Sequence, residues 1–177
     1  MEKLIKKPSN LKELLECQVF LEDHIKKERH NGFIPRFPAE VDLFLALDDE
    51  IQEWLKELPN EFNFKFWKKH KYIREDELKE FADILFFILQ IVNRNRDLLF
   101  YHMEKIFDNF NYKASYLNYE IIQLKKYIWD FDIIKAFEHY IYIAHIRGIS
   151  KTELLDSYWN KFVYNLSPKR INFDWSL

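Results

Sequence analysis

The chain has 177 residues, a size typical of one folded domain, and its 48% hydrophobic content is sufficient for a buried core. A formal net charge of −2 gives no overall attraction to nucleic acid or to an anionic membrane, and the single cysteine, Cys17, excludes an intrachain disulfide and a cysteine-rich zinc site. Only two glycines occur, which excludes a glycine-rich phosphate loop, and no apolar stretch suits a secretory signal or a membrane span. We therefore expect a cytoplasmic protein that would bind phosphates only through a metal and cationic side chains.

Apolar residues follow helical spacing along nearly the whole chain, and neither strand alternation nor an internal repeat is found, which predicts an all-α fold. In chain order, the predicted helices cover residues 11–25, 38–58, 75–93, 97–128 (one helix or two), 130–147 and 150–165. A loop at 31–38 and a basic, aromatic connection at 59–74 separate the first three of these helices.

Capping signals mark several of the predicted helix ends. Asn10 with Glu13, and Ser150 with Glu153, have the spacing of a capping box. Gly148 is typical of the position just past a helix C-terminus.

Four carboxylates interrupt the apolar faces of the second and third predicted helices. Glu50 and Glu53 are three residues apart, and after 26 intervening residues Glu80 and Asp83 repeat that spacing. If the two helices pack antiparallel, the four side chains converge, and such a cluster requires protons or a cation. Oxygen ligands favour Mg²⁺, or Mn²⁺ as a substitute, whereas a di-iron bundle would require a histidine three residues after a glutamate, and none occurs. Solvent-facing charge on amphipathic helices is the alternative, and it applies most to Glu50 and Glu53.

Three further motifs accompany the E-x-x-E and E-x-x-D pairs. "LECQVFLEDHIKKERHNG" contains Gln18 and Glu22, "NFKFWKK" has the form F-K-x-W, and "YWNKFVYN" has the form Y-x-x-K-x-x-x-N. In this order the five motifs resemble those of the all-α nucleoside triphosphate pyrophosphatases, the MazG-like superfamily. Within that superfamily the chain resembles the dimeric dUTPases.

The resemblance implies a homodimeric, MazG-like helical bundle of one domain, with a more mobile portion over residues 95–150. It also implies Mg²⁺-dependent hydrolysis of dUTP, and of dUDP as well, with attack on the β-phosphorus and release of dUMP. The metal ligands would be Glu50, Glu53, Glu80 and Asp83, and Glu53 would act as general base. The substrate-binding residues would be Gln18, Glu22, Lys65, Trp67, Tyr158, Lys161, Asn165 and Arg170.

Several of these residues also have a purely structural interpretation. Lys65 and Lys161 could be solvated lysines, Trp67 a core residue, Asn165 a helix cap, and Gln18 a polar residue on a half-buried face.

The chain departs from the family pattern at three places. Glu53 and Glu57 form a rival register for the first carboxylate pair, although Glu50 and Glu53 align upstream without a gap. Glu22 stands where some relatives have Asn, which keeps open a sister enzyme for another dNTP such as dCTP. Pro168 follows the late motif, so Arg170 or Lys169 must serve in place of the family's arginine. A non-enzymatic helical interaction protein is a third hypothesis, and it predicts no metal dependence.

Overall fold

The computed structural model describes residues 5–29, 38–109 and 115–167. Over these residues it contains seven helices and no strand, which confirms the predicted all-α fold. The helices are α1 (Leu11–Arg29), α2 (Glu40–Glu57), α3 (Arg74–Arg94), α4 (Arg96–Asp108), α5 (Leu117–Trp129), α6 (Ile133–Ile146) and α7 (Lys151–Asn165). None of these helices is both long and apolar enough to cross a membrane.

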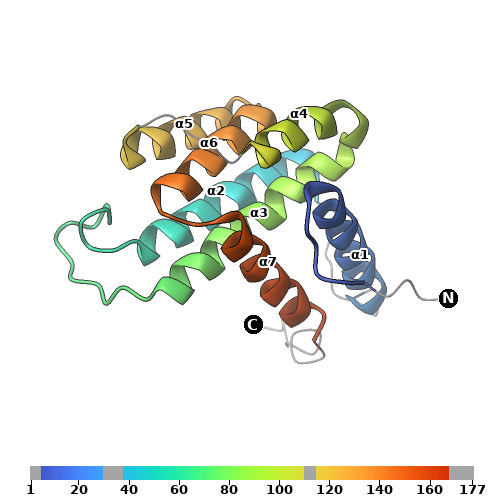
Figure 1. Cartoon of the computed structure of the whole chain (residues 1–177), viewed down its shortest axis with the longest axis horizontal. Helices are drawn as coiled ribbons and strands as arrows, with labels where there is room; N and C mark the ends of the chain where they lie inside the picture. The colour runs from blue at the N-terminus through green and yellow to red at the C-terminus, as the bar shows by residue number, and fades with distance from the viewer. Residues whose placement is uncertain (1–4, 30–37, 110–114, 168–177) are drawn as a thin grey trace.

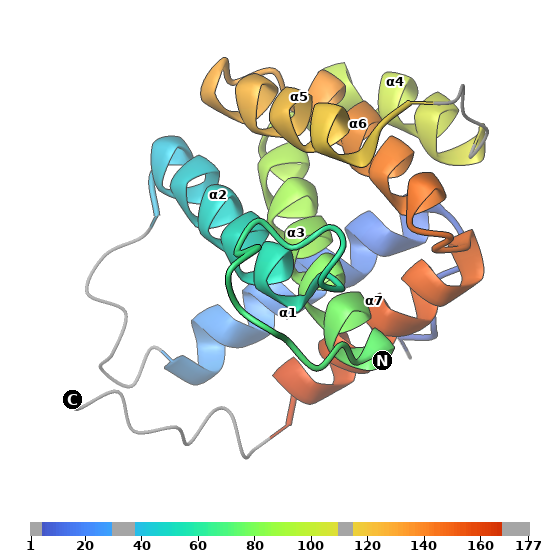
Figure 2. The same ribbon diagram turned by 90° about the vertical axis from the view of Figure 1, so that its left-hand side faces the viewer.

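Helices α2 and α3 form the centre of the molecule (Figure 1). They pack antiparallel, the arrangement in which the carboxylates can converge, and the irregular connection 58–73 joins them. Helices α4, α5 and α6 lie on one side of this pair, and α1 and α7 lie on the other (Figure 2). That α4 to α6 move as a more mobile portion stays a prediction.

The helix ends show which capping signals operate. Ser150 and Glu153 form the predicted capping box, since each side chain bonds to the backbone N–H of the other. At α1 the Asn10 side chain accepts from the Glu13 N–H at 2.9 Å, but the Glu13 carboxylate does not return the bond to Asn10. It accepts instead from the N–H and the hydroxyl of Ser9, because that residue offers two donors.

The turn between α6 and α7 follows the glycine signal. Gly148 has φ of +61°, a left-handed conformation that glycine adopts without a Cβ clash. The Ile149 N–H then bonds to the Ala144 carbonyl at 2.8 Å, which closes the C-terminus of α6 in a Schellman motif. The beginning of α6 is three residues later than predicted, because Asp132 caps it by accepting from the Lys135 N–H.

An aromatic stack connects the central helices to the layer that covers them. Trp54 of α2 packs against Phe81 of α3 with ring centroids 5.3 Å apart, and Phe81 stacks on Tyr140 of α6 at 4.2 Å. All three side chains are fully buried, and the Tyr140 hydroxyl donates to the Phe81 carbonyl at 2.9 Å. The stack therefore ties α2 and α3 to each other and to α6.

Candidate metal and nucleotide site

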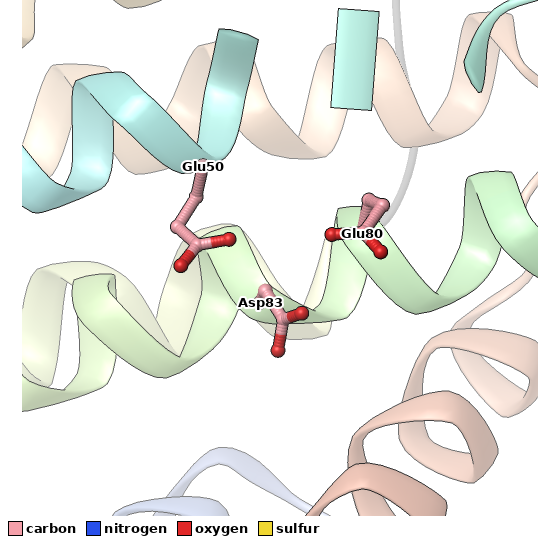
Figure 3. Close-up of side chains that lie close together, drawn as sticks. All are labelled: Glu50, Glu80 and Asp83. Carbon is pink, nitrogen blue, oxygen red and sulfur yellow. The ribbon is translucent and has the colours of Figure 1, made fainter. Parts of the chain in front are cut away.

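Three carboxylates gather where α2 faces α3. Glu50 of α2 faces Glu80 and Asp83 of α3, and one oxygen of each lies within 4.8 Å of one oxygen of the other two (Figure 3). Glu80 and Asp83 are three residues apart on one helix, so their side chains project to the same face. Phe81 lies between Glu80 and Asp83 in the sequence and packs in the aromatic stack. Packing of Phe81 in the core therefore helps to set the orientation of the two carboxylates.

The electrostatics of the cluster disfavour three negative charges. Burial raises the pKa of Glu50, and the charges of Asp83 and Glu53 raise it further, to about 7. Burial also raises the pKa of Asp83, against the opposing effect of Lys161. A neutralising cation is therefore favoured in this cluster above pH 7.

Two lysines contact the cluster. Lys79 Nζ lies 2.7 Å from Glu80 Oε1, but the Lys79 side chain is mostly exposed. Lys161 of α7 bonds to Asp83 Oδ2, and both side chains of that pair are nearly buried. The two lysines also line a groove of about 440 Å³ between α3 and α7, with Ser157, Asn160 and Tyr164 among the other lining residues.

The carboxylates fit a divalent metal ion. Their oxygens are close enough to share one ion, and oxygen-only ligands suit a hard cation. Their mutual repulsion gives a physical reason why a cation would be held there, because burial and the neighbouring acids raise the pKa of Glu50 and burial raises the pKa of Asp83.

Glu53 and Glu57 occupy different surroundings on α2. Glu53 is exposed and lies outside the group of three, although it is close enough to raise the pKa of Glu50. Glu57 approaches the connection instead, with its carboxylate 3.8 Å from His70 Nε2. This geometry favours the register of Glu50 with Glu53 over that of Glu53 with Glu57.

Gln18 and Glu22 lie one helical turn apart on α1. Gln18 is fully buried, and its side-chain carbonyl accepts from the Tyr158 hydroxyl at 3.2 Å. Gln18 Nε2 and Glu22 Oε1 are buried without a hydrogen-bond partner among the described residues. Burial raises the pKa of Glu22. The Gln18 side chain is nevertheless near enough to Glu22 to lower the pKa of that carboxyl, so the two groups form a buried polar pair that a ligand could contact.

The remaining candidates of the late motif are held by α7. Tyr158 is fully buried and stacks on Phe86 at 4.3 Å, so its effect on a ligand would pass through Gln18. Asn165 is the last residue of α7, and Arg170 lies outside the described residues.

The connection 58–73 exposes its aromatic residues. Trp67 is 64% exposed and Phe66 87% exposed, with the two rings edge-on at 5.1 Å, so the core-packing alternative for Trp67 is wrong. Lys65 Nζ lies 5.5 Å from the Phe64 ring centroid, still on this connection. The structure does not bring Lys65 or Trp67 into the carboxylate cluster.

Sequence reasoning missed several residues around the site. Lys79 directly precedes Glu80 in the sequence, and this position was the signal that could have predicted its contact with the cluster. Asn93 donates to the Leu15 carbonyl at 3.3 Å, while its own side-chain oxygen is buried without a partner among the described residues. Tyr140 carried no signal, because its contact with Phe81 spans 59 residues of sequence.

Fold and site together define a class of protein. An all-α bundle whose central antiparallel helices bring Glu50 of the E-x-x-E pair to both acids of the E-x-x-D pair is consistent with the all-α nucleoside triphosphate pyrophosphatases. The family model described as dUTPase matches residues 10–173. The chain belongs to this family, the dimeric all-α type of dUTPase, and is a dUTP diphosphatase, a hydrolase acting on acid anhydrides. No curated protein is found to match it.

Proposed function

We propose that this dUTP diphosphatase depends on Mg²⁺, with Mn²⁺ as a substitute, and converts dUTP to dUMP and pyrophosphate while also accepting dUDP. The observation that carries this proposal is the convergence of Glu50, Glu80 and Asp83 from two helices. The family match favours dUTP over another dNTP and over a non-enzymatic role.

The carboxylates divide into ligands and a base. Glu50, Glu80 and Asp83 hold the metal, which when bound neutralises phosphate charge and lowers the pKa of a coordinated water. Glu53 contributes at the edge of the cluster. Glu53 is exposed to solvent and lies one helical turn from Glu50. Its carboxylate can therefore accept a proton from the attacking water.

Cationic side chains stabilise the charge that develops on the phosphate oxygens. Lys161 is the best supported of these, since its ammonium already lies in the cluster. Lys65 and Arg170 are proposed to act beside it on the strength of their motif positions.

Base and sugar recognition is assigned to α1 and its neighbours. Uracil offers the N3–H donor and two carbonyl acceptors, which suit the Glu22 carboxyl and the Gln18 amide. Tyr158 holds the Gln18 carbonyl in place. Trp67 and Asn165 complete the proposed set as contacts to the nucleotide.

We further propose that the protein works as a homodimer in the cytoplasm, where its substrate belongs to the free nucleotide pool. The exposed Phe66 and Trp67 support a dimer, because large aromatic residues are enriched at protein interfaces. A dimer would also bring the connection 58–73 of one chain near a surface of the other.

Pyrophosphate release from a panel of dNTPs, with and without Mg²⁺, tests the proposal. We expect metal-dependent release selective for dUTP, and a loss of at least about a hundredfold in kcat for Glu53→Gln, as is typical when a general base is removed. Glu57→Gln is the matched control, one turn further along α2, and should retain activity.

The outcomes separate the alternatives. Selective cleavage of dCTP would keep the metal site but overturn the assignment of Gln18 and Glu22 to uracil. Loss of activity in Glu57→Gln, together with retention in Glu50→Gln, would establish the rival register of Glu53 with Glu57. Absence of cleavage for every dNTP would overturn the proposal.

A further inference from the structure

Lys161 lies inside the carboxylate cluster, although it belongs to a different helix from the three acids. It bonds to Asp83 Oδ2, with 12% of the Lys161 side chain and 11% of the Asp83 side chain exposed. Its charge also acts on Glu50, whose pKa it lowers against the larger effects of burial and the neighbouring acids. One ammonium thus serves two of the three carboxylates.

The second lysine provides an internal comparison. Lys79 pairs with Glu80 at 2.7 Å, but 56% of its side chain is exposed. Ion pairs at exposed positions contribute little, because water screens them and a long side chain must be ordered. Lys161 and Asp83 are nearly buried, so water screens their interaction less, and the charge of Lys161 has the larger effect on the cluster.

An ammonium and a divalent ion compete for the same carboxylate, Asp83. A hard cation binds to charged carboxylate oxygens, and Asp83 Oδ2 already accepts from Lys161. Two positive charges held within a few ångströms in a partly buried site repel each other strongly. Binding of the ion therefore favours withdrawal of Lys161 from Asp83.

Space for this withdrawal exists beside the cluster. Lys161 lines the groove of about 440 Å³ between α3 and α7, and Ser157, Asn160 and Tyr164 offer polar groups along it. The lysine side chain is a flexible chain of four carbons, so rotation about its bonds can turn the ammonium from Asp83 into the groove without movement of α7.

We propose that Lys161 is an internal counter-cation of the carboxylate cluster, which a divalent ion displaces from Asp83 and which then pairs with the phosphates of the nucleotide. The second step rests on the function proposed above, whereas the first does not. Metal binding is weakened in the absence of nucleotide, because the ion must break a buried ion pair. A nucleotide gives the released ammonium a new anion, so ion and nucleotide strengthen each other's binding by the same factor.

Mn²⁺ binding to the full chain without nucleotide tests the first step, measured by the loss of the free aquo-Mn²⁺ signal in electron paramagnetic resonance. We expect Lys161→Met to bind Mn²⁺ roughly five- to tenfold more tightly than wild type, the lower end of the range for coupled sites. Lys161→Arg keeps the charge and should bind as wild type does. Lys79→Met is the matched control, which removes the exposed lysine and should change the affinity less than about twofold.

Several results would overturn the proposal. Equal or weaker Mn²⁺ binding by Lys161→Met would show that Lys161 is no competitor, as would an absence of binding in both proteins. An equal gain in Mn²⁺ affinity in Lys79→Met would show that the gain comes from the change in net charge and not from the position of Lys161. If Lys161→Met fails to fold by circular dichroism, Lys161→Gln replaces it, since its side chain is polar but uncharged, and a gain in the same direction is expected.

Failure here is distinguishable from failure of the proposed function, because the Mn²⁺ measurement involves no substrate. Wild type that cleaves dUTP with Mg²⁺, together with unchanged Mn²⁺ affinity in Lys161→Met, would overturn only the competition. A gain in affinity without any dNTP cleavage would support the competition and overturn the proposed function.

Discussion

At the scale of single residues, Glu50 is the side chain most affected by its surroundings. It is partly buried, lies beside Asp83 and near Glu53, and has no ion-pair partner among the described residues. These conditions favour its neutral form. A divalent ion would reverse the preference, so Glu50 links protonation, metal binding and stability.

The stability of the protein without divalent ions should therefore decrease as pH rises. The pKa of Glu50 is about 7 in the folded chain against an ordinary value of 4.5, so the folded state binds more protons than the unfolded state between these values. The free energy of unfolding should fall from about pH 5 to about pH 8, and urea titrations in a chelator would measure it. Glu50→Gln should reduce this fall, and saturating Mg²⁺ should suppress it. A slope unchanged in Glu50→Gln would contradict the assignment.

At the scale of elements, an ion-pair network joins the beginning of α3 to the turn between α6 and α7. Glu77 is fully buried and receives two bonds from Arg147, at 2.7 and 3.0 Å, and one from the Tyr72 hydroxyl at 2.7 Å. Arg74 bonds to the carbonyls of Arg147 and Gly148. The network holds α7, and with it Lys161, at a fixed position against α3.

Breaking this network should strongly destabilise the fold. Glu77→Gln leaves Arg147 without a carboxylate in a site where only 10% of its side chain is exposed, and such a loss costs about 3–5 kcal/mol. The control is Glu153→Gln, which removes an exposed pair with Arg74 worth less than about 1 kcal/mol and retains a glutamine suited to the capping box. Urea unfolding of both variants measures the difference, and similar midpoints would show that burial does not govern the network.

The turn after α6 allows a separate test of backbone conformation. Gly148 has φ of +61°, and a Cβ built there meets no atom within 4 Å. Gly148→Ala should therefore cost about 1–2 kcal/mol through the left-handed backbone alone, without a packing change. Thermal unfolding would show the loss, while Mn²⁺ affinity and dUTP cleavage should stay at wild-type values. No loss of stability would mean that the turn adopts another conformation.

Much of the fold was predictable because it depends on local signals. Helical spacing, the Ser150 capping box and Gly148 each act within a few residues, and α2 and α3 are adjacent along the chain. The pairing of Lys161 with Asp83 spans 78 residues, and nothing in either motif specifies it. The exposure of Trp67 also depends on how an irregular connection lies on the surface. Spacing predicted that the carboxylates share a face, but not that Glu53 would lie at its edge.

At the scale of the whole molecule, the exposed aromatic residues are the feature that bears on the proposed homodimer. Phe66 and Trp67 expose large aromatic rings on the connection between the two carboxylate helices. Sedimentation equilibrium should give twice the mass of the 22.0-kDa chain, consistent with the commonest symmetry of oligomers. Trp67→Ser should weaken association and make specific activity fall on dilution. A monomer with full activity at all concentrations would contradict the proposed homodimer.

The contact between α1 and α7 has a consequence for how the enzyme comes to be active during folding. The bond from the Tyr158 hydroxyl to Gln18 joins residues 140 positions apart, whereas the carboxylates of α2 and α3 are neighbours in sequence. Contacts between distant segments form slowly, because a long loop must close first. We expect a refolding chain to recover Mn²⁺ binding before it recovers dUTP cleavage. A newly made enzyme would thus hold its metal for a time before it can select its substrate.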